Sequence, residues 1–184
     1  YVDGEDRTYE MFFKANFPTA DFVNDTRLLA NKSTTVSRGV LLFTYKTDRN
    51  WVALQVIVGG AWLSSWTTTP MTTGTWYHIA ATYEFNTNGY FNSDLNVFLD
   101  GSHDSVDSGW SMNQPSLSWL SIAGDTAGGA NEFPGCIDEV RVSDNVRSAD
   151  WIAAGYNNQT APGSFASPSA ESTQTLSGTL VLIK

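Results

Sequence analysis

The chain has 184 residues, enough for one domain with a substantial buried core. Its net charge of −9 argues against nucleic acid and anionic membrane surfaces as partners, because both attract basic proteins. A single cysteine, Cys136, excludes an intrachain disulfide and a cysteine-based zinc site, and no apolar run reaches membrane-span length. The chain opens on YVDGEDR without an initiator methionine or a signal-like segment, so we expect a mature form or an excised piece.

The first clear unit is a three-strand meander between residues 38 and 66. The segments KTDRNW and VGGA are turn signals, and the Gly-Gly pair favours a tight hairpin. This hairpin places Ile57 opposite Trp62, and the preceding turn is expected to place Phe43 opposite Leu54. One face then gathers apolar residues and is predicted to face the core: Leu41, Phe43, Tyr45, Val52, Leu54, Val56, Val58 and Leu63.

The opposite face of the meander is too apolar for a surface that meets water. An antiparallel sheet with one wet face alternates apolar and polar residues, yet this face carries three tryptophans. A covering segment of the chain, a protein interface or a flat ligand such as a sugar ring would each explain them. The candidate ligand-binding residues on this face are Trp51, Gln55, Trp62 and Trp66.

Four strands and one helix are predicted after residue 75. Strand-like alternation appears in TWYHIAATYEF, LNVFLDG, LSWLSIAG and CIDEVRV. A short helix is expected near residues 148–155, with Ser148 as its N-cap and Asp150 in its first turn. His78 lies in the first of these strands without a metal-spaced partner, so we expect a sheet residue rather than a catalytic base.

Residues 166–184 differ in composition from the rest of the chain and are treated as a separate unit after residues 1–165. They begin as an extended linker and end on an apolar run typical of a buried strand, Leu180, Val181, Leu182 and Ile183. We expect residues 176–183 to complete a sheet, in their own domain or in a neighbouring copy, with this run as the partner-binding element.

The order of motifs in the second half of the chain resembles a known family. The segments WYHIAATYE, NVFLDG, SIAGD, GCIDEVRVSDNVRSADWI and YNNQTAPGSF follow one another as in laminin-G-like, concanavalin A-like domains of bacterial and archaeal surface proteins. The resemblance covers about residues 1–165. It implies an all-β, two-sheet antiparallel jelly-roll sandwich with one short helix, secretion, and binding or adhesion without catalysis. It also makes CIDEVRV the closing strand, with Ile137, Val140 and Val142 on its apolar side.

The neighbouring acids Asp138 and Glu139 decide whether an enzyme is expected. Glycoside hydrolysis needs two carboxylates facing one cleft, and adjacent residues of a strand point to opposite faces, so we expect no catalytic pair and no enzyme. The resemblance implies one structural calcium ion instead, with Asp138 and Asp3 as candidate ligands, because calcium prefers about six to eight oxygen ligands. The alternative is an ion pair of Asp138 or Glu139 with Arg141 or Arg147.

Three functions fit these patterns. The first is a non-catalytic module that binds carbohydrate or a surface protein through the tryptophans and rim loops. The second is a structural subunit of a surface filament or multi-domain adhesin, in which the C-terminal strand is added to another copy. The third, a glycoside hydrolase, lacks a suitably spaced pair of acids. We expect no nucleic acid partner and no membrane insertion, and an extracellular or cell-surface location.

Overall fold

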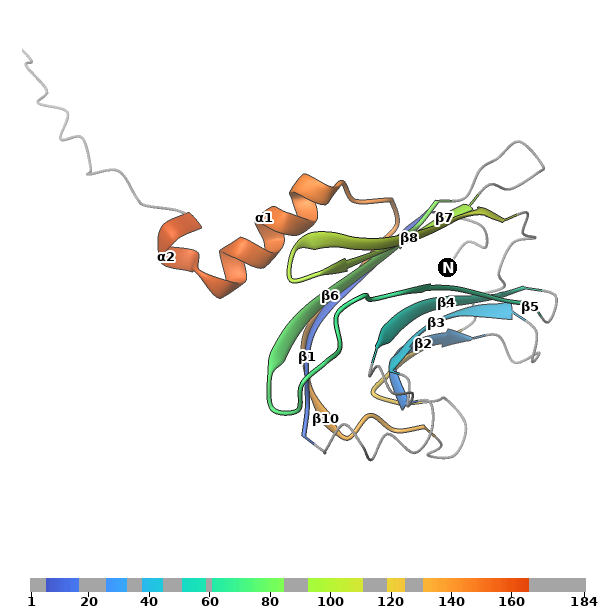
Figure 1. The fold of residues 1–184 in the computed structure, drawn as a ribbon, viewed down its shortest axis with the longest axis horizontal. Helices are drawn as coiled ribbons and strands as arrows, with labels where there is room; N and C mark the ends of the chain where they lie inside the picture. Colours follow the sequence, from blue (N-terminus) through green and yellow to red (C-terminus); the bar gives the residue numbers. More distant parts are fainter. Residues whose placement is uncertain are drawn as a thin grey trace, which may run out of the picture.

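The computed structural model describes residues 6–16, 26–32, 38–44, 51–58, 61–84, 93–110, 119–124 and 131–165. Within these ranges the chain forms ten strands and two helices (Figure 1). The strands are β1 (Arg7–Ala15), β2 (Thr26–Lys32), β3 (Arg38–Thr44), β4 (Val52–Val58), β5 (Ala61–Trp66), β6 (Trp76–Tyr83), β7 (Ser93–Leu99), β8 (Ser102–Trp110), β9 (Trp119–Ile122) and β10 (Gly135–Ser143). The predicted linker and C-terminal strand, residues 166–184, lie outside the described residues.

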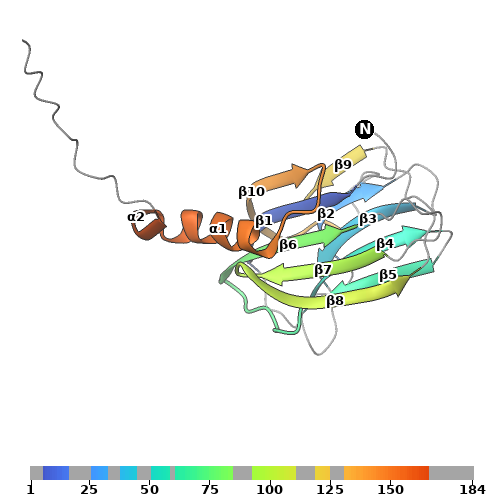
Figure 2. The same ribbon diagram turned by 90° about the horizontal axis from the view of Figure 1, so that it is seen from above.

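The strands pair into two antiparallel sheets that face each other (Figures 1 and 2). Sheet A has the order β10-β1-β6-β7-β8, and sheet B has the order β5-β4-β3-β2-β9. Neighbours such as β1 and β6 are distant in sequence, so the chain crosses repeatedly from one sheet to the other. This is the two-sheet sandwich that the sequence predicts, and the all-β fold class is confirmed.

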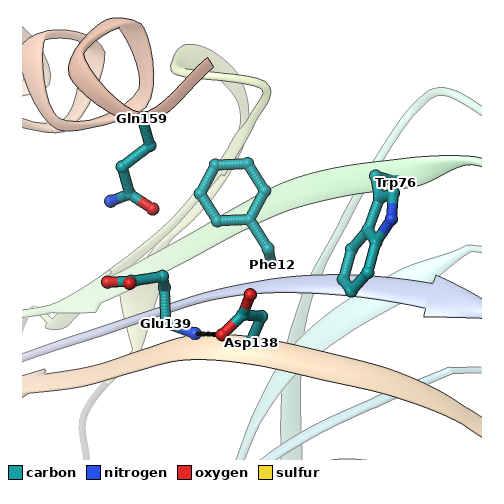
Figure 3. Close-up of a pocket in the computed structure, with 5 residues that line it drawn as sticks. All are labelled: Phe12, Trp76, Asp138, Glu139 and Gln159. Atoms are coloured by element: carbon teal, nitrogen blue, oxygen red, sulfur yellow. Dashed lines mark hydrogen bonds between the residues drawn. The ribbon is translucent and has the colours of Figure 1, made fainter. Parts of the chain in front are cut away.

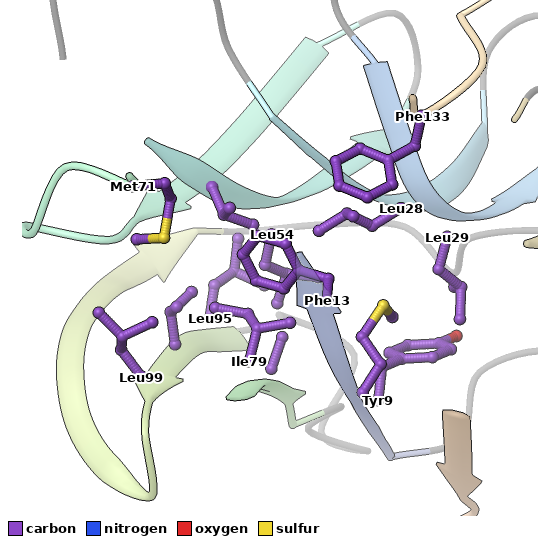
Figure 4. Packing of buried hydrophobic residues seen from close by; sticks show 14 of the residues in the cluster. Tyr9, Phe13, Leu28, Leu29, Leu54, Met71, Ile79, Leu95, Leu99 and Phe133 are labelled. Atoms are coloured by element: carbon purple, nitrogen blue, oxygen red, sulfur yellow. The ribbon is translucent and has the colours of Figure 1, made fainter. Parts of the chain in front are cut away.

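The hydrophobic core lies between the sheets, and the alternation of side chains along β1 shows how it is built. On β1, Tyr9, Met11 and Phe13 point inward and are at most 1% exposed, whereas Glu10 and Phe12 point to the outer face of sheet A. Figure 4 shows the inward side chains of both sheets packed together. The largest fully buried side chains are Tyr9, Tyr83, Phe13, Met11, Leu28, Leu29, Leu54 and Ile79.

The helix α1 (Ala149–Thr160) lies against the outer face of sheet A, on the side away from sheet B (Figure 1). Ser148 is its N-cap, as predicted, and its hydroxyl accepts a hydrogen bond from the amide of Trp151 at 3.2 Å. Ile152 anchors the helix by packing with Ala80 and Phe98 in a second, small buried cluster.

The helix is longer than the sequence predicted, ending at Thr160 instead of near residue 155. The glycine and asparagines at 155, 157 and 158 resemble turn residues, but contact with the sheet outweighs their weak helix propensity. The helix ends just before Pro162, which has no amide proton for a further helical bond. A second short helix, α2 (Pro162–Phe165), follows. No helix in the described ranges is long and apolar enough to cross a membrane.

The predicted register of the meander is confirmed for one ladder and wrong for the other. Ile57 lies opposite Trp62 as predicted, but Leu42, not Phe43, lies opposite Leu54. The last observed pair is Thr44 with Val52, so seven residues, 45–51, connect the two strands. The prediction assumed a four-residue turn between them. A slip of one residue exchanges the two faces of a strand. Positions 40 and 42, rather than the predicted 41 and 43, therefore share a face with the buried Val56 and Leu54.

Candidate functional site

A β-bulge in β10 changes the direction of its side chains. Glu10 lies opposite Arg141 and Phe12 opposite Asp138, so two residues, Glu139 and Val140, lie opposite the single residue Met11. Glu139 adopts a left-handed backbone conformation, with φ of 50°, which is uncommon for a residue with a side chain. Bulges of this kind bend the strand and re-aim its side chains.

Asp138 and Glu139 consequently line the same pocket, of about 410 Å³, together with Phe12, Trp76 and Gln159 (Figure 3). The prediction that the two acids point to opposite faces is wrong, because it assumed regular alternation and the bulge interrupts it. Asp138 Oδ1 accepts a hydrogen bond from the Glu139 amide at 2.9 Å, which fixes the Asp138 carboxylate against the backbone of the bulge. The geometric reason for excluding a catalytic pair therefore fails, and the absence of catalysis stays a prediction.

An ion pair fixes one wall of the pocket. Arg141 Nη2 donates to Glu139 Oε2 at 3.1 Å, which confirms the predicted ion-pair alternative for Glu139. With the Gln159 carbonyl turned toward Arg141, it accepts from both terminal guanidinium nitrogens, at 3.0 Å from Nη1. The pair is partly exposed and contributes little to stability. The Arg141 guanidinium instead orients two pocket side chains, because it bonds both to Glu139 on β10 and to Gln159 on α1.

The ring of Phe12 lines the pocket and lies next to His78, its neighbour on β6, which forms a buried polar pair with Glu10. The Phe12 ring centroid is 4.9 Å from that of His78 and 6.2 Å from that of Tyr156, which stacks on it from α1. His78 and Glu10 are each 2% exposed, with Nε2 and Oε2 3.9 Å apart. His78 is thus a buried sheet residue, as predicted.

Burial disfavours the charged form of both members of this pair. Burial, aided by the nearby positive charge of Arg141, lowers the pKa of His78 from 6.5 to about 4. Burial also raises the pKa of Glu10, against the opposing effect of Arg141 and Arg147. Among the described residues, neither Glu10 oxygen has a hydrogen-bond partner, and neither has His78 Nδ1. At neutral pH His78 is therefore uncharged.

The predicted tryptophan site lies on the other sheet, on its outer face. Trp62 is 52% exposed. It shares the outer face of β5 with Ser64 and Trp66, and β5 forms one edge of sheet B. Trp51 packs against Trp66, with ring centroids 6.5 Å apart at 55°. Gln55 is only 3% exposed, and its Nε2 donates to Ser64 Oγ at 2.6 Å. Trp62 thus presents the most exposed ring of this group, whereas Gln55 is buried opposite Ser64.

The calcium site stays a prediction. Asp138 is exposed at the pocket, whereas Asp3 lies outside the described residues. In the part of the chain that the structure describes, no three acidic, histidine or cysteine side chains are grouped so that they could hold a metal.

If calcium does bind through Asp138, chelation is expected to lower the melting temperature, because a ligand that binds the folded state stabilises it. The Asp138→Ala variant should then melt at the same temperature with and without chelator. Differential scanning fluorimetry with added calcium or EDTA measures both. Identical melting curves of the wild-type protein in the two conditions would contradict a structural calcium ion.

Three pocket residues were not identified from the sequence: Phe12, Trp76 and Gln159. Phe12 had a signal, because it alternates with the buried Phe13 and so places an apolar ring on the outer face of sheet A. Trp76 and Gln159 had none beyond their places in the segments TWYHIAATYEF and YNNQTAPGSF. Gln159 comes near Asp138 through packing of α1 on the sheet, and Trp76 comes near it through the pairing of β6 with β1 and of β1 with β10. Local patterns specify neither.

The fold and sequence together define the class of protein. A laminin-G family model, described as the Concanavalin A-like lectin/glucanases superfamily, matches residues 1–153. The chain therefore belongs to this family, and the resemblance seen in the sequence is confirmed. No curated protein sequence matches the chain.

Solved structures with the same fold have low sequence identity to this chain. Domain 4 of AbnA, an extracellular GH43 arabinanase from Geobacillus stearothermophilus in complex with arabinotriose, is 15% identical with a TM-score of 0.61, covering 83% of this chain and 66% of that one. The CBM40 of the Ruminococcus gnavus IT-sialidase, bound to α2,3-sialyllactose, is 15% identical with a TM-score of 0.61, covering 81% and 82%.

A third structure is a putative carbohydrate-binding protein from Bacteroides ovatus, 19% identical with a TM-score of 0.61. The match covers 83% of this chain but 41% of that one, so this chain spans well under half of the Bacteroides protein. At these identities the structures share the fold with this chain, and they specify no residue of its site.

Proposed function

We propose that this domain is a non-catalytic, extracellular module that binds carbohydrate. The observation that carries the proposal is the half-exposed ring of Trp62 in a row of tryptophan and serine side chains on the outer face of sheet B. The family assignment supports it, as do the neighbours solved with arabinotriose and with sialyllactose. The ligands and the extracellular location of those neighbours are properties of the neighbours. For this chain we infer a glycan partner outside the cell.

The chemistry of this surface suits a sugar ring. An indole face provides a flat apolar surface for the C–H groups of a pyranose or furanose. Ser64 Oγ already accepts a hydrogen bond from Gln55, so its own proton is left to donate to a ligand oxygen. Trp51 supports Trp66 from the side. Gln55 is buried, so its role in binding is to orient Ser64.

Replacing Trp62 by alanine is expected to weaken glycan binding about 5- to 150-fold, if stacking of a sugar on the indole contributes the about 1–3 kcal/mol that a nucleic-acid base gains on an aromatic side chain. Isothermal titration calorimetry with the strongest ligand from a glycan array measures the loss. Trp151→Ala is the matched control, because Trp151 is 38% exposed and lies on α1, on the opposite side of the molecule. Equal affinities of the Trp62→Ala variant and the wild type would contradict the proposed surface.

The structural-subunit function is a second candidate, favoured by one observation. The strand β9 lies at the end of sheet B and exposes Leu120 by 38% and Ile122 by 50%. An edge strand with apolar side chains is a template for strand addition. We infer that the apolar run Leu180–Ile183, which lies outside the described residues, would be the added strand.

Deletion of residues 172–184 separates the two forms of this candidate. If the strand is exchanged between copies, the truncated chain should be a soluble monomer that keeps its melting temperature. If the strand folds back on its own domain, the truncated monomer should melt at a lower temperature. Size-exclusion chromatography and thermal melting measure both. A truncated protein with an unchanged melting temperature and assembly state would show that the tail has no structural role.

A further inference from the structure

The pocket at the bulge has the size and the walls of a ligand site distinct from the tryptophan face. Its volume of about 410 Å³ falls within the range of small-molecule sites, about 300–1,000 Å³. Its side walls come from separate elements, with Trp76 on β6 and Gln159 on α1 (Figure 3). Trp76 is 44% exposed, so its ring is accessible to a ligand.

The polar groups of the pocket determine what it can accept. Ionised carboxylates accept hydrogen bonds and donate none, so Asp138 and Glu139 require donors from a ligand. An anionic ligand would place further acceptors and a like charge against them, which is unfavourable. A carboxylated sugar is therefore a poor fit for this pocket.

A cationic ligand is disfavoured by two basic residues already present. Arg141 donates to Glu139, so the charge of that carboxylate is partly compensated. Lys14 Nζ lies 5.1 Å from the centroid of the Trp76 ring, so this cation–π site is also taken. The two acids and two bases around the pocket balance in charge, which leaves uncharged hydroxyl groups as the best-matched donors.

We propose that this pocket is a second carbohydrate site that binds an uncharged sugar ring and rejects acidic sugars. The ring would lie between Trp76 and Phe12, with its hydroxyls donating to Asp138 and Glu139. The proposal rests on the proposed carbohydrate-binding function but uses a different surface, on sheet A instead of sheet B. The bulge is essential to it, because only there do both acids face one pocket.

A titration followed at individual tryptophans tests the pocket. The probes are methyl β-D-galactopyranoside, methyl β-D-glucopyranoside, glucosamine and glucuronate, each added to the full chain labelled with ¹⁵N. The indole N–H signals of Trp76 and Trp62, assigned with single tryptophan-to-phenylalanine variants, report the two surfaces separately. We expect an uncharged glycoside to shift the Trp76 signal, with at least tenfold weaker binding of glucuronate.

The double variant Asp138→Asn with Glu139→Gln keeps the shape of the pocket and removes its charge. It should bind the uncharged glycoside at least tenfold more weakly and lose the discrimination against glucuronate. Asp144→Asn, at an exposed acid outside the pocket lining, is the matched control and should behave as the wild type.

Three results would overturn the pocket proposal. They are a Trp76 signal that no uncharged glycoside shifts, tighter binding of glucuronate or glucosamine than of the uncharged glycosides, and binding that disappears on chelation of divalent cations. A shift confined to Trp62 would overturn the pocket while supporting the proposed function. A shift confined to Trp76 would support the pocket and move the proposed function away from sheet B.

Discussion

Acidification from pH 6.5 to pH 4 is expected to remove about 3 kcal/mol of stability through His78 alone. The pKa of this side chain is about 4 in the folded protein and 6.5 in its ordinary state. Between these values the unfolded chain binds a proton that the folded protein does not bind. The stability that the uncharged His78 contributes is therefore fully present above pH 6.5, and it is lost as the pH falls toward 4.

Glu10 acts in the opposite direction. Its pKa is raised in the folded protein, so the folded state takes up a proton at a higher pH than the unfolded chain. This favours folding as the pH falls, and it offsets part of the effect of His78. Substitution of His78 by glutamine separates the two, because it removes the titrating imidazole and leaves Glu10 in place.

Urea denaturation at pH 7, 6 and 5 measures these effects. The wild type should lose stability across the series, whereas His78→Gln should lose much less. His103→Gln is the control, because His103 is an exposed histidine on β8. Parallel losses of the wild type and His78→Gln would contradict the assignment of acid sensitivity to His78.

Replacing Gly101 by alanine is expected to destabilise the protein by about 3 kcal/mol. Gly101 has φ of 77°, which costs a residue with a side chain about 1–2 kcal/mol. An added Cβ would also lie 2.9 Å from Cβ and Cδ1 of Tyr156, so α1 would have to move outward. Such overpacking costs about a further 1–3 kcal/mol.

Gly74 is a matched control for this substitution, because it has nearly the same φ, 78°, and nothing within 4 Å of an added Cβ. Gly74→Ala should therefore cost only the conformational part, about 1–2 kcal/mol. Urea denaturation of both variants gives the difference. Equal losses in the two variants would show that Tyr156 is not held tightly against Gly101.

The alternating segments of the chain were sufficient to predict the meander β3–β5, four later strands and one ladder, whereas β1, β2 and β8 were not predicted. β6, β7, β9 and β10 lie where the period-two patterns place them, and the hairpin register of β4 and β5 follows from its Gly-Gly turn. The N-cap at Ser148 was also predictable, because its hydroxyl acts within one helical turn. These features depend on residues that are close in sequence.

The bulge was not predicted, although the sequence carries a trace of it. Ile137, Val140 and Val142 all pack against the core. Their spacing of three and then two departs from strict alternation, and an inserted residue is what restores all three to one face. The left-handed conformation falls on Glu139, not on a glycine, so the usual residue signal for it was missing.

The pocket could not be derived from local patterns, because its residues meet only in the folded protein. Phe12 and Gln159 are distant in sequence, and they come together through the pairing of β1 with β10 and the docking of α1. The register of β3 and β4 failed for a related reason, since it depends on a connection whose conformation the turn residues do not fix.

A glycan array probed with the wild-type chain and with Trp62→Ala tests the binding function most directly. We expect the wild type to bind a defined set of glycans and the Trp62→Ala variant to lose most of that signal, because the half-exposed indole provides the stacking surface. A wild-type chain that is folded and binds no glycan on the array would contradict the carbohydrate-binding function and leave the structural-subunit function as the better explanation.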